Sequence, residues 1–113
     1  PTTAQHAARE ALATCDDEVA EMRREYDRRR RYVLARLEEM GLDCAPAEGA
    51  FYAFPEVPGD DEAVAEALLR EERVAAVPGS AFGAGGAGHL RLSYATAMPR
   101  LKEAMERLER FLD

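Results

Sequence analysis

The sequence of 113 residues has no tryptophan, one lysine and two cysteines. No apolar stretch approaches the roughly 20 residues that a membrane-spanning helix needs, and the first residues lack the basic start and apolar run of a signal peptide. Cys15 and Cys44 fall in no metal-ligand spacing. These absences predict a soluble cytoplasmic protein without a metal site, in which a structural disulfide is not expected.

Basic residues are outnumbered, since the chain has 22 acidic and 15 basic side chains, which give a formal charge of −7. This charge disfavours nucleic acid or an anionic membrane as a partner. Lys102 is the only lysine. An acidic, lysine-poor composition fits a halophilic protein, but GC-rich coding also replaces lysine by arginine, and the composition leaves both explanations open.

The length suits one compact domain over residues 1–113. The chain opens at Pro1 directly into helix-favouring sequence, so we expect a segment of a longer protein. An alanine-rich helix is predicted from Thr3 to Leu12, with Thr2 or Thr3 as its N-cap. We expect residues 1–15 to lie near the boundary with a neighbouring domain.

Apolar spacing predicts a long amphipathic helix from Asp16 to Met40, ended by Gly41. Asp60 or Asp61 is expected to cap a third helix. The last helix has Pro99 near its start and apolar residues at helical spacing. These are Leu101, Met105, Leu108, Phe111 and Leu112.

Four strands are predicted between the helices, at Asp43–Pro46, Gly49–Pro55, Val74–Val77 and His89–Ala95, with the first two forming a hairpin. In the last strand Leu90, Leu92 and Tyr94 would share one face and leave Arg91 on the other. The expected fold class is α/β, an α+β sandwich in which helices cover a small mixed or antiparallel sheet of about three or four strands. The element order is α-β-β-α-β-β-α.

Two strings in the sequence have simple explanations. The run Arg28–Arg31 lies mid-helix among acidic residues, so ion pairs along a solvated face are favoured over phosphate binding. The string Gly83–Gly88 satisfies GxGxxG, but it runs into a strand, whereas a dinucleotide fingerprint must open a helix. A flexible loop is predicted there. His6 and His89 lack partners at metal-ligand or catalytic spacing.

Arg91 is the strongest candidate for a binding residue. An arginine centred in an apolar strand can hold its planar guanidinium rigidly, and this group matches a carboxylate with two parallel hydrogen bonds. Spacing alone also permits an arginine that simply faces solvent. Ser80 lacks the context of a nucleophile, and Phe51, Tyr52 and Phe54 are expected to belong in part to the core.

Three segments in order add a resemblance. They are Gly49-Ala50-Phe51-Tyr52, Val74-Ala75-Ala76-Val77-Pro78-Gly79-Ser80-Ala81-Phe82-Gly83 and His89-Leu90-Arg91-Leu92-Ser93-Tyr94-Ala95. Together they resemble the class I and II aminotransferases of pyridoxal-phosphate (PLP) fold type I, in the aspartate aminotransferase superfamily. The likeness covers nearly the whole chain and implies the C-terminal small domain of such an enzyme.

The resemblance implies residue roles. Arg91 would bind the substrate α-carboxylate, Phe51 would line the pocket, and Gly49 and Ser80 would lie near it. The full-length enzyme would be a homodimer that uses PLP to transfer an amino group between an L-amino acid, aspartate or another, and a 2-oxo acid. The Schiff-base lysine belongs to the family's large domain, so the chain alone, with only Lys102, is expected to be inactive and to bind no cofactor.

Other functions stay open. A stand-alone regulatory domain could bind an amino acid with the same layers and the same arginine. A structural fragment would expose an apolar docking surface. Related PLP enzymes perform lyase, decarboxylase or acyl-transfer chemistry on the same fold.

Overall fold

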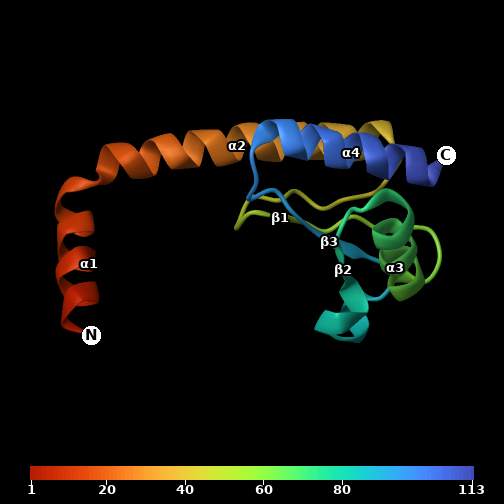
Figure 1. The fold of residues 1–113 in the computed structure, drawn as a ribbon, viewed down its shortest axis with the longest axis horizontal. Coiled ribbons are helices and arrows are strands. Elements are labelled where there is room, and N and C mark those ends of the chain that lie inside the picture. The colour runs from red at the N-terminus through yellow and green to blue at the C-terminus, as the bar shows by residue number, and fades with distance from the viewer.

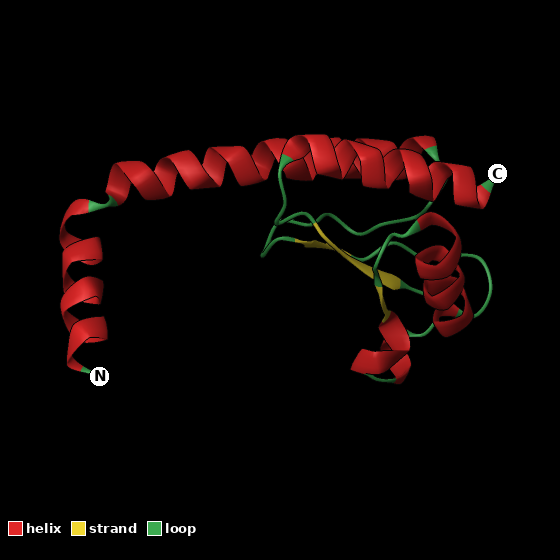
Figure 2. Ribbon diagram, viewed as in Figure 1, coloured by secondary structure: helices red, strands yellow, loops and turns green.

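The computed structural model describes residues 1–113 and contains four α-helices, a three-stranded sheet and two short 3₁₀ helices. The elements are α1 (Thr2–Thr14), α2 (Asp16–Glu39), β1 (Tyr52–Ala53), α3 (Asp61–Glu72), β2 (Val77–Pro78), η1 (Gly79–Phe82), η2 (Ala84–Gly86), β3 (Leu90–Ser93) and α4 (Met98–Leu112). Helices cover a small antiparallel sheet, so the predicted fold class is confirmed (Figure 2).

The ends of α2 follow signals in the sequence. Its first turn carries three acidic residues, whose charges suit the positive end of the helix dipole. Gly41 adopts a left-handed conformation with φ 74°, and the Leu42 N–H donates to the Leu37 carbonyl at 3.0 Å. This bond closes the C-terminus as the glycine predicts.

The N-terminal residues predicted for the other three helices are only partly confirmed. Asp60 caps α3, because its carboxylate accepts a hydrogen bond from the Ala63 N–H at 2.9 Å. The threonine cap predicted for α1 is wrong, since Pro1 occupies the cap position and no side chain caps the helix. α4 begins with Pro99 in its first turn, as predicted.

The sheet has the order β1-β3-β2, and β3 pairs antiparallel with both neighbours. The segment 43–46 forms no strand and pairs only through an isolated bridge from Cys44 to Pro55. Pro55 has no N–H to extend a ladder, which accounts for the short pairing. The strand predicted at 74–77 lies later, at Val77–Pro78, because the Val74 N–H closes α3 by donating to Leu68.

α2 and α4 lie side by side across one face of the sheet (Figure 1). Two contacts show that the helices run in the same direction. Tyr32 of α2 faces Lys102 of α4, and Arg36, later in α2, contacts Glu109, later in α4. The buried apolar core lies between these helices, α3 and the sheet. It consists of Val33, Leu37, Ala53, Val57, Ala65, Leu68, Leu90, Tyr94, Leu101, Met105 and Leu108.

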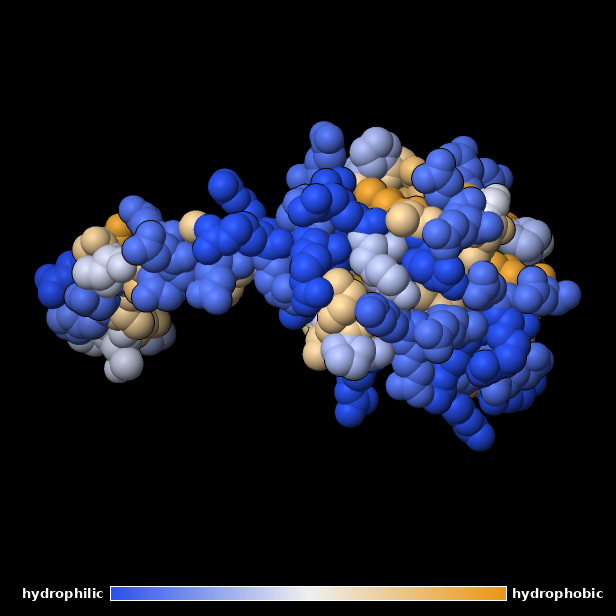
Figure 3. Space-filling model, turned by 90° about the horizontal axis from the view of Figure 1, so that it is seen from above, coloured by the Kyte–Doolittle hydropathy of each residue, from blue (hydrophilic) through white to orange (hydrophobic).

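α1 stands apart from this core. It contains no buried residue, and it turns away from the N-terminal end of α2, which lies beyond the sheet (Figure 1). From above, α1 projects beyond a body whose surface is mainly hydrophilic (Figure 3). The radius of gyration is therefore 16.7 Å, against about 13 Å for a compact domain of this length. No helix combines the length and the apolar character needed to cross a membrane.

Candidate functional site

The guanidinium of Arg91 lies between two aromatic rings. Its central carbon is 4.4 Å from the centre of the Tyr52 ring and 4.7 Å from that of Phe82. Both distances are within the range of cation–π attraction. The rings come from β1 and η1, so three separate elements fix the position of one charged group.

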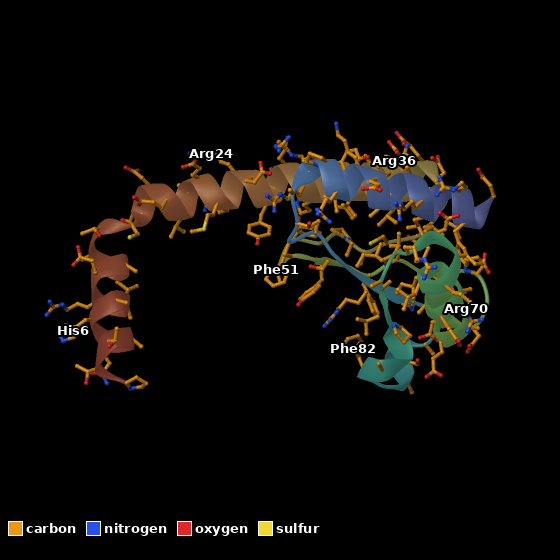
Figure 4. All side chains as sticks on the ribbon, in the orientation of Figure 1. His6, Arg24, Arg36, Phe51, Arg70 and Phe82 are labelled. Carbon is orange, nitrogen blue, oxygen red and sulfur yellow. The ribbon has the colours of Figure 1, made fainter.

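The register of the sheet explains this arrangement. Tyr52 pairs with Ser93, and Arg91 is therefore its diagonal neighbour on the same face. Leu90 and Tyr94 are buried in the core, so alternation along the strand turns Arg91 to the opposite face. The prediction that Arg91 lies opposite Leu90 and Tyr94 is confirmed. Figure 4 shows Phe82 on the side of the domain away from α2 and α4.

The positive charge of Arg91 has no acidic partner within the chain. Arg91 takes part in none of the ion pairs, whereas Arg28, Arg29, Arg30 and Arg31 all pair with acids one turn away. The two rings contact the guanidinium, and its N–H groups donate to no side chain or carbonyl of the chain, so they are able to donate to a ligand. Such donors suit a planar anion with two acceptor oxygens.

Tyr52 and Phe82 were not singled out as binding residues by the sequence. A signal for Tyr52 existed, because an aromatic residue near an arginine on a paired strand can stack on it. The sequence alone, however, does not give the register in which β1 pairs with β3, and so does not say which residue lies beside Tyr52. Phe82 lies nine residues from Arg91 in the chain and reaches it only through η1.

Phe51 extends the aromatic surface beside Arg91. Its ring centre is 4.6 Å from that of Tyr52 and 5.9 Å from that of Tyr26, and its side chain is partly exposed. Arg91 and Phe51 are thus joined through the Tyr52 ring. Figure 4 shows Phe51 near the end of the sheet that lies toward the middle of α2.

The other two predicted site residues lie elsewhere. Gly49 borders a hollow of about 470 Å³ between α2 and the segment 47–50, which Arg23, Arg24 and Tyr94 also line. The Ser80 hydroxyl donates to a Glu62 carboxylate oxygen at 3.3 Å, toward α3. No hydrogen bond joins either residue to the Arg91 side chain, and their proximity to the substrate stays a prediction.

The segment between β2 and β3, where a flexible loop was predicted, contains regular turns. It forms η1 and η2, and the backbones of Gly79 and Gly86 cross closely. A Cβ added at Gly79 would lie 2.0 Å from the Gly86 carbonyl oxygen. Gly83 and Gly88 have positive φ angles of 114° and 77°. The glycines therefore serve a tight backbone fold, and no helix suited to a dinucleotide follows them.

The arginine run forms the predicted ion pairs along α2, with Arg28 and Arg31 exposed and Arg29 and Arg30 partly buried. Glu25 accepts hydrogen bonds from Arg28 and Arg29, and Asp27 accepts them from Arg30. The bonds from Arg28 and then Arg29 lower the pKa of Glu25 to about 2. These charges are satisfied within one helix, which removes the reason to assign the run to phosphate binding.

The residues of this chain do not fit PLP by themselves. The cofactor needs a lysine that forms the Schiff base and, across the ring, an acid that pairs with the ring nitrogen. Lys102, the only lysine, has its Nζ 6.0 Å from the centre of the Tyr32 ring, on the α2–α4 side of the domain. No three His, Cys, Asp or Glu side chains converge in a group that could hold a metal ion.

The family model for aminotransferase class I and II matches residues 1–108. The chain belongs to this family of enzymes. It is 49% identical over 119 aligned residues to an aspartate aminotransferase of Pyrococcus abyssi and 47% identical over 119 to aromatic-amino-acid aminotransferase 2 of Thermococcus litoralis. Each alignment covers 98% of this chain and 30% of the relative.

A solved structure has the same fold. The aspartate aminotransferase of Thermotoga maritima superposes with a TM-score of 0.90 at 46% identity, over 98% of this chain and 28% of that one. The chain thus spans less than a third of the length of these relatives. The three relatives are each named as aminotransferases.

Proposed function

We propose that this chain is the small domain of a longer PLP-dependent aminotransferase, in which Arg91 binds the α-carboxylate of the amino acid and of the 2-oxo acid. The observation that carries the proposal is the unpaired guanidinium of Arg91, fixed between Tyr52 and Phe82. A carboxylate would accept two parallel hydrogen bonds from its edge. Holding the carboxylate in one orientation would also fix the Cα to which the amino group is attached.

The two curated relatives support a role in binding what all amino acids share. One is named for aspartate and the other for aromatic amino acids, yet they are 49% and 47% identical to this chain. Their substrates differ in the side chain and share the α-carboxylate. A domain that is similarly related to both fits a carboxylate-binding role better than a role in selecting the side chain.

The exposed apolar side chains support a division into domains. Leu12 of α1 is 85% exposed, and Val19 and Met22, one turn apart on α2, are more than half exposed. We infer that another domain of the same protein covers them, since the relatives are about three times as long. That domain would hold PLP and supply the lysine. The homodimer and the cytoplasmic location stay predictions from the resemblance.

The first test uses the full-length protein supplied with PLP. A visible cofactor absorbance that changes when an L-amino acid is added, with formation of the matching 2-oxo acid, is the expected result. Absence of cofactor absorbance would contradict the enzyme proposal. It would instead favour a regulatory amino-acid-binding domain, which should bind an amino acid without PLP.

The second test isolates Arg91. Arg91→Ala should lower kcat/KM for amino donors, with a loss of about 2–5 kcal/mol of transition-state stabilisation, because a charge-assisted contact is lost. Arg91→Lys should restore little, since an ammonium cannot form the two parallel bonds. Arg100→Ala is the matched control, because Arg100 also lacks an ion-pair partner but lies on α4. Unchanged activity of Arg91→Ala would overturn the assignment.

A further inference from the structure

Asp61 is the one charged side chain buried in the domain. It is 3% exposed, and no arginine or lysine pairs with it. A carboxylate taken out of water needs hydrogen-bond donors to offset the lost hydration. The chain provides them from the segment 79–88, which is distant in sequence from α3.

Two backbone N–H groups donate to the Asp61 carboxylate. The Ser80 N–H is 2.7 Å from one oxygen and the Gly88 N–H is 3.3 Å from the other. These donors lie near the beginning and at the end of the segment 79–88, which contains η1 and η2 and is called the η1–η2 segment below. One buried carboxylate therefore ties both ends of this segment to the first turn of α3.

Phe82 lies between the two tied positions. The crossing of Gly79 and Gly86 keeps the segment compact, so the Phe82 ring has a defined place over the Arg91 guanidinium. Without Asp61, two N–H groups would lose their acceptor and the segment would relax. The Arg91 side chain would then lose one of the two rings that hold it.

We propose that Asp61 is a positioning residue for substrate binding, which orients the Arg91 guanidinium by tying the η1–η2 segment and its Phe82 ring in place. This inference rests on the proposed carboxylate-binding role of Arg91. Asp61 makes no ion pair with Arg91 and acts through Ser80, Gly88 and Phe82. Its effect should therefore be limited to substrates that present an α-carboxylate.

The test compares two donors in the full-length protein with PLP. One is an L-amino acid and the other is the amine that lacks only its α-carboxylate: L-aspartate with β-alanine, or L-phenylalanine with 2-phenylethylamine. The measured quantity is the ratio of the single-turnover rate constants, amino acid over amine, at subsaturating donor. Asp61→Ala should lower this ratio at least ten-fold, because only the amino acid needs the Arg91 guanidinium in its correct orientation.

Asp60→Ala is the matched control. It removes the same charge at the same end of α3, but Asp60 bonds to Ala63 and not to the η1–η2 segment. Its ratio should stay within about two-fold of the wild-type value. If Asp61→Ala fails to fold, Asp61→Asn carries the test, because its amide oxygen can accept one of the two bonds, and at least a three-fold loss is expected.

Two further measurements separate the possible failures. In an Arg91→Ala background, Asp61→Ala should lower the ratio no further. Amide hydrogen exchange in residues 80–88 should accelerate in Asp61→Ala but not in Arg91→Ala. Equal losses for amino acid and amine, or an additive loss in the double variant, would overturn the role of Asp61 while leaving that of Arg91. A ratio unchanged in Arg91→Ala would overturn both.

Discussion

The guanidinium carbon of Arg91 lies 4.4 Å above the centre of the Tyr52 ring. Tyr52 and Arg91 are 39 residues apart in the chain and meet because β1 and β3 are paired with Tyr52 opposite Ser93. The contact places a cation on an apolar surface that continues through Phe51. This surface and the charge together define the face of the domain to which a carboxylate is expected to bind.

The second ring over Arg91 gives a direct prediction. Phe82→Leu should weaken amino-acid-dependent activity by about 1 kcal/mol, near five-fold, because a cation–π contact on a partly exposed surface has roughly that strength. kcat/KM of the full-length protein measures the effect. Phe111→Leu, a phenylalanine of α4 that does not stack on Arg91, is the control and should leave kcat/KM near its wild-type value.

The crossing of two backbones predicts different outcomes for two glycines. Gly79→Ala should lower the free energy of unfolding by about 1–3 kcal/mol, since its Cβ would overlap the Gly86 carbonyl and the Phe54 ring. Gly85→Ala places its Cβ in open space at an ordinary φ and should have little effect. Denaturant titration of both variants checks this. Equal stability of the two would show that the backbones do not cross so closely.

The exposed leucines test the domain boundary. Leu12→Asp in α1 should lower the melting temperature of the full-length protein, because the proposed second domain covers this side chain. Leu69→Asp in α3 makes the same change at a leucine that is 51% exposed, on a helix at the opposite end of the molecule from α1 (Figure 1). It should leave the melting temperature nearly unchanged. The reverse order of the two effects would contradict the proposed boundary.

A leucine of the buried core provides a reference for the predicted changes in the free energy of unfolding. Leu37 of α2 is completely buried between α4 and the sheet. Leu37→Ala should cost about 2–5 kcal/mol of the free energy of unfolding, because it removes buried methyl groups and leaves a cavity. Denaturant titration measures the loss. A loss below about 1 kcal/mol would mean that this core is loosely packed.

Acid should destabilise the domain. The pKa values of Asp61 and Glu72 are lowered, chiefly by hydrogen bonds from the Ser80 N–H and from Arg110. A carboxyl group whose pKa is lower in the folded state contributes stability above its unfolded pKa, near 4, and this contribution is lost as pH falls through the folded pKa. The denaturant midpoint should therefore fall between about pH 5 and pH 2.

The same titration tests Asp61 separately. Asp61→Asn removes one of the titrating groups, so its midpoint should depend less steeply on pH over this acid range. The Asn variant should also be less stable than the wild type at pH 7, because its uncharged side chain accepts weaker bonds. An identical slope in both proteins would show that Asp61 does not titrate with folding.

Local signals in the sequence were enough to predict the helices. The spacing of Leu101, Met105 and Leu108 predicted the buried face of α4, and Gly41 predicted the end of α2. These signals act within one or two turns, so they do not depend on the rest of the fold. The alternation around Arg91 likewise predicted which face of β3 carries the charge.

Tertiary structure decided what Arg91 and Asp61 contact. Strand register placed Tyr52 beside Arg91. A shift of the register by one residue would have turned the Tyr52 side chain to the core. Asp61 looked like a helix cap in the sequence and became a buried acceptor because the η1–η2 segment folds back onto α3. The sequence by itself determined the helices, the family and the candidate arginine. Only the packing of distant segments decided the rings and the carboxylate around it, because those contacts depend on residues far apart in the chain.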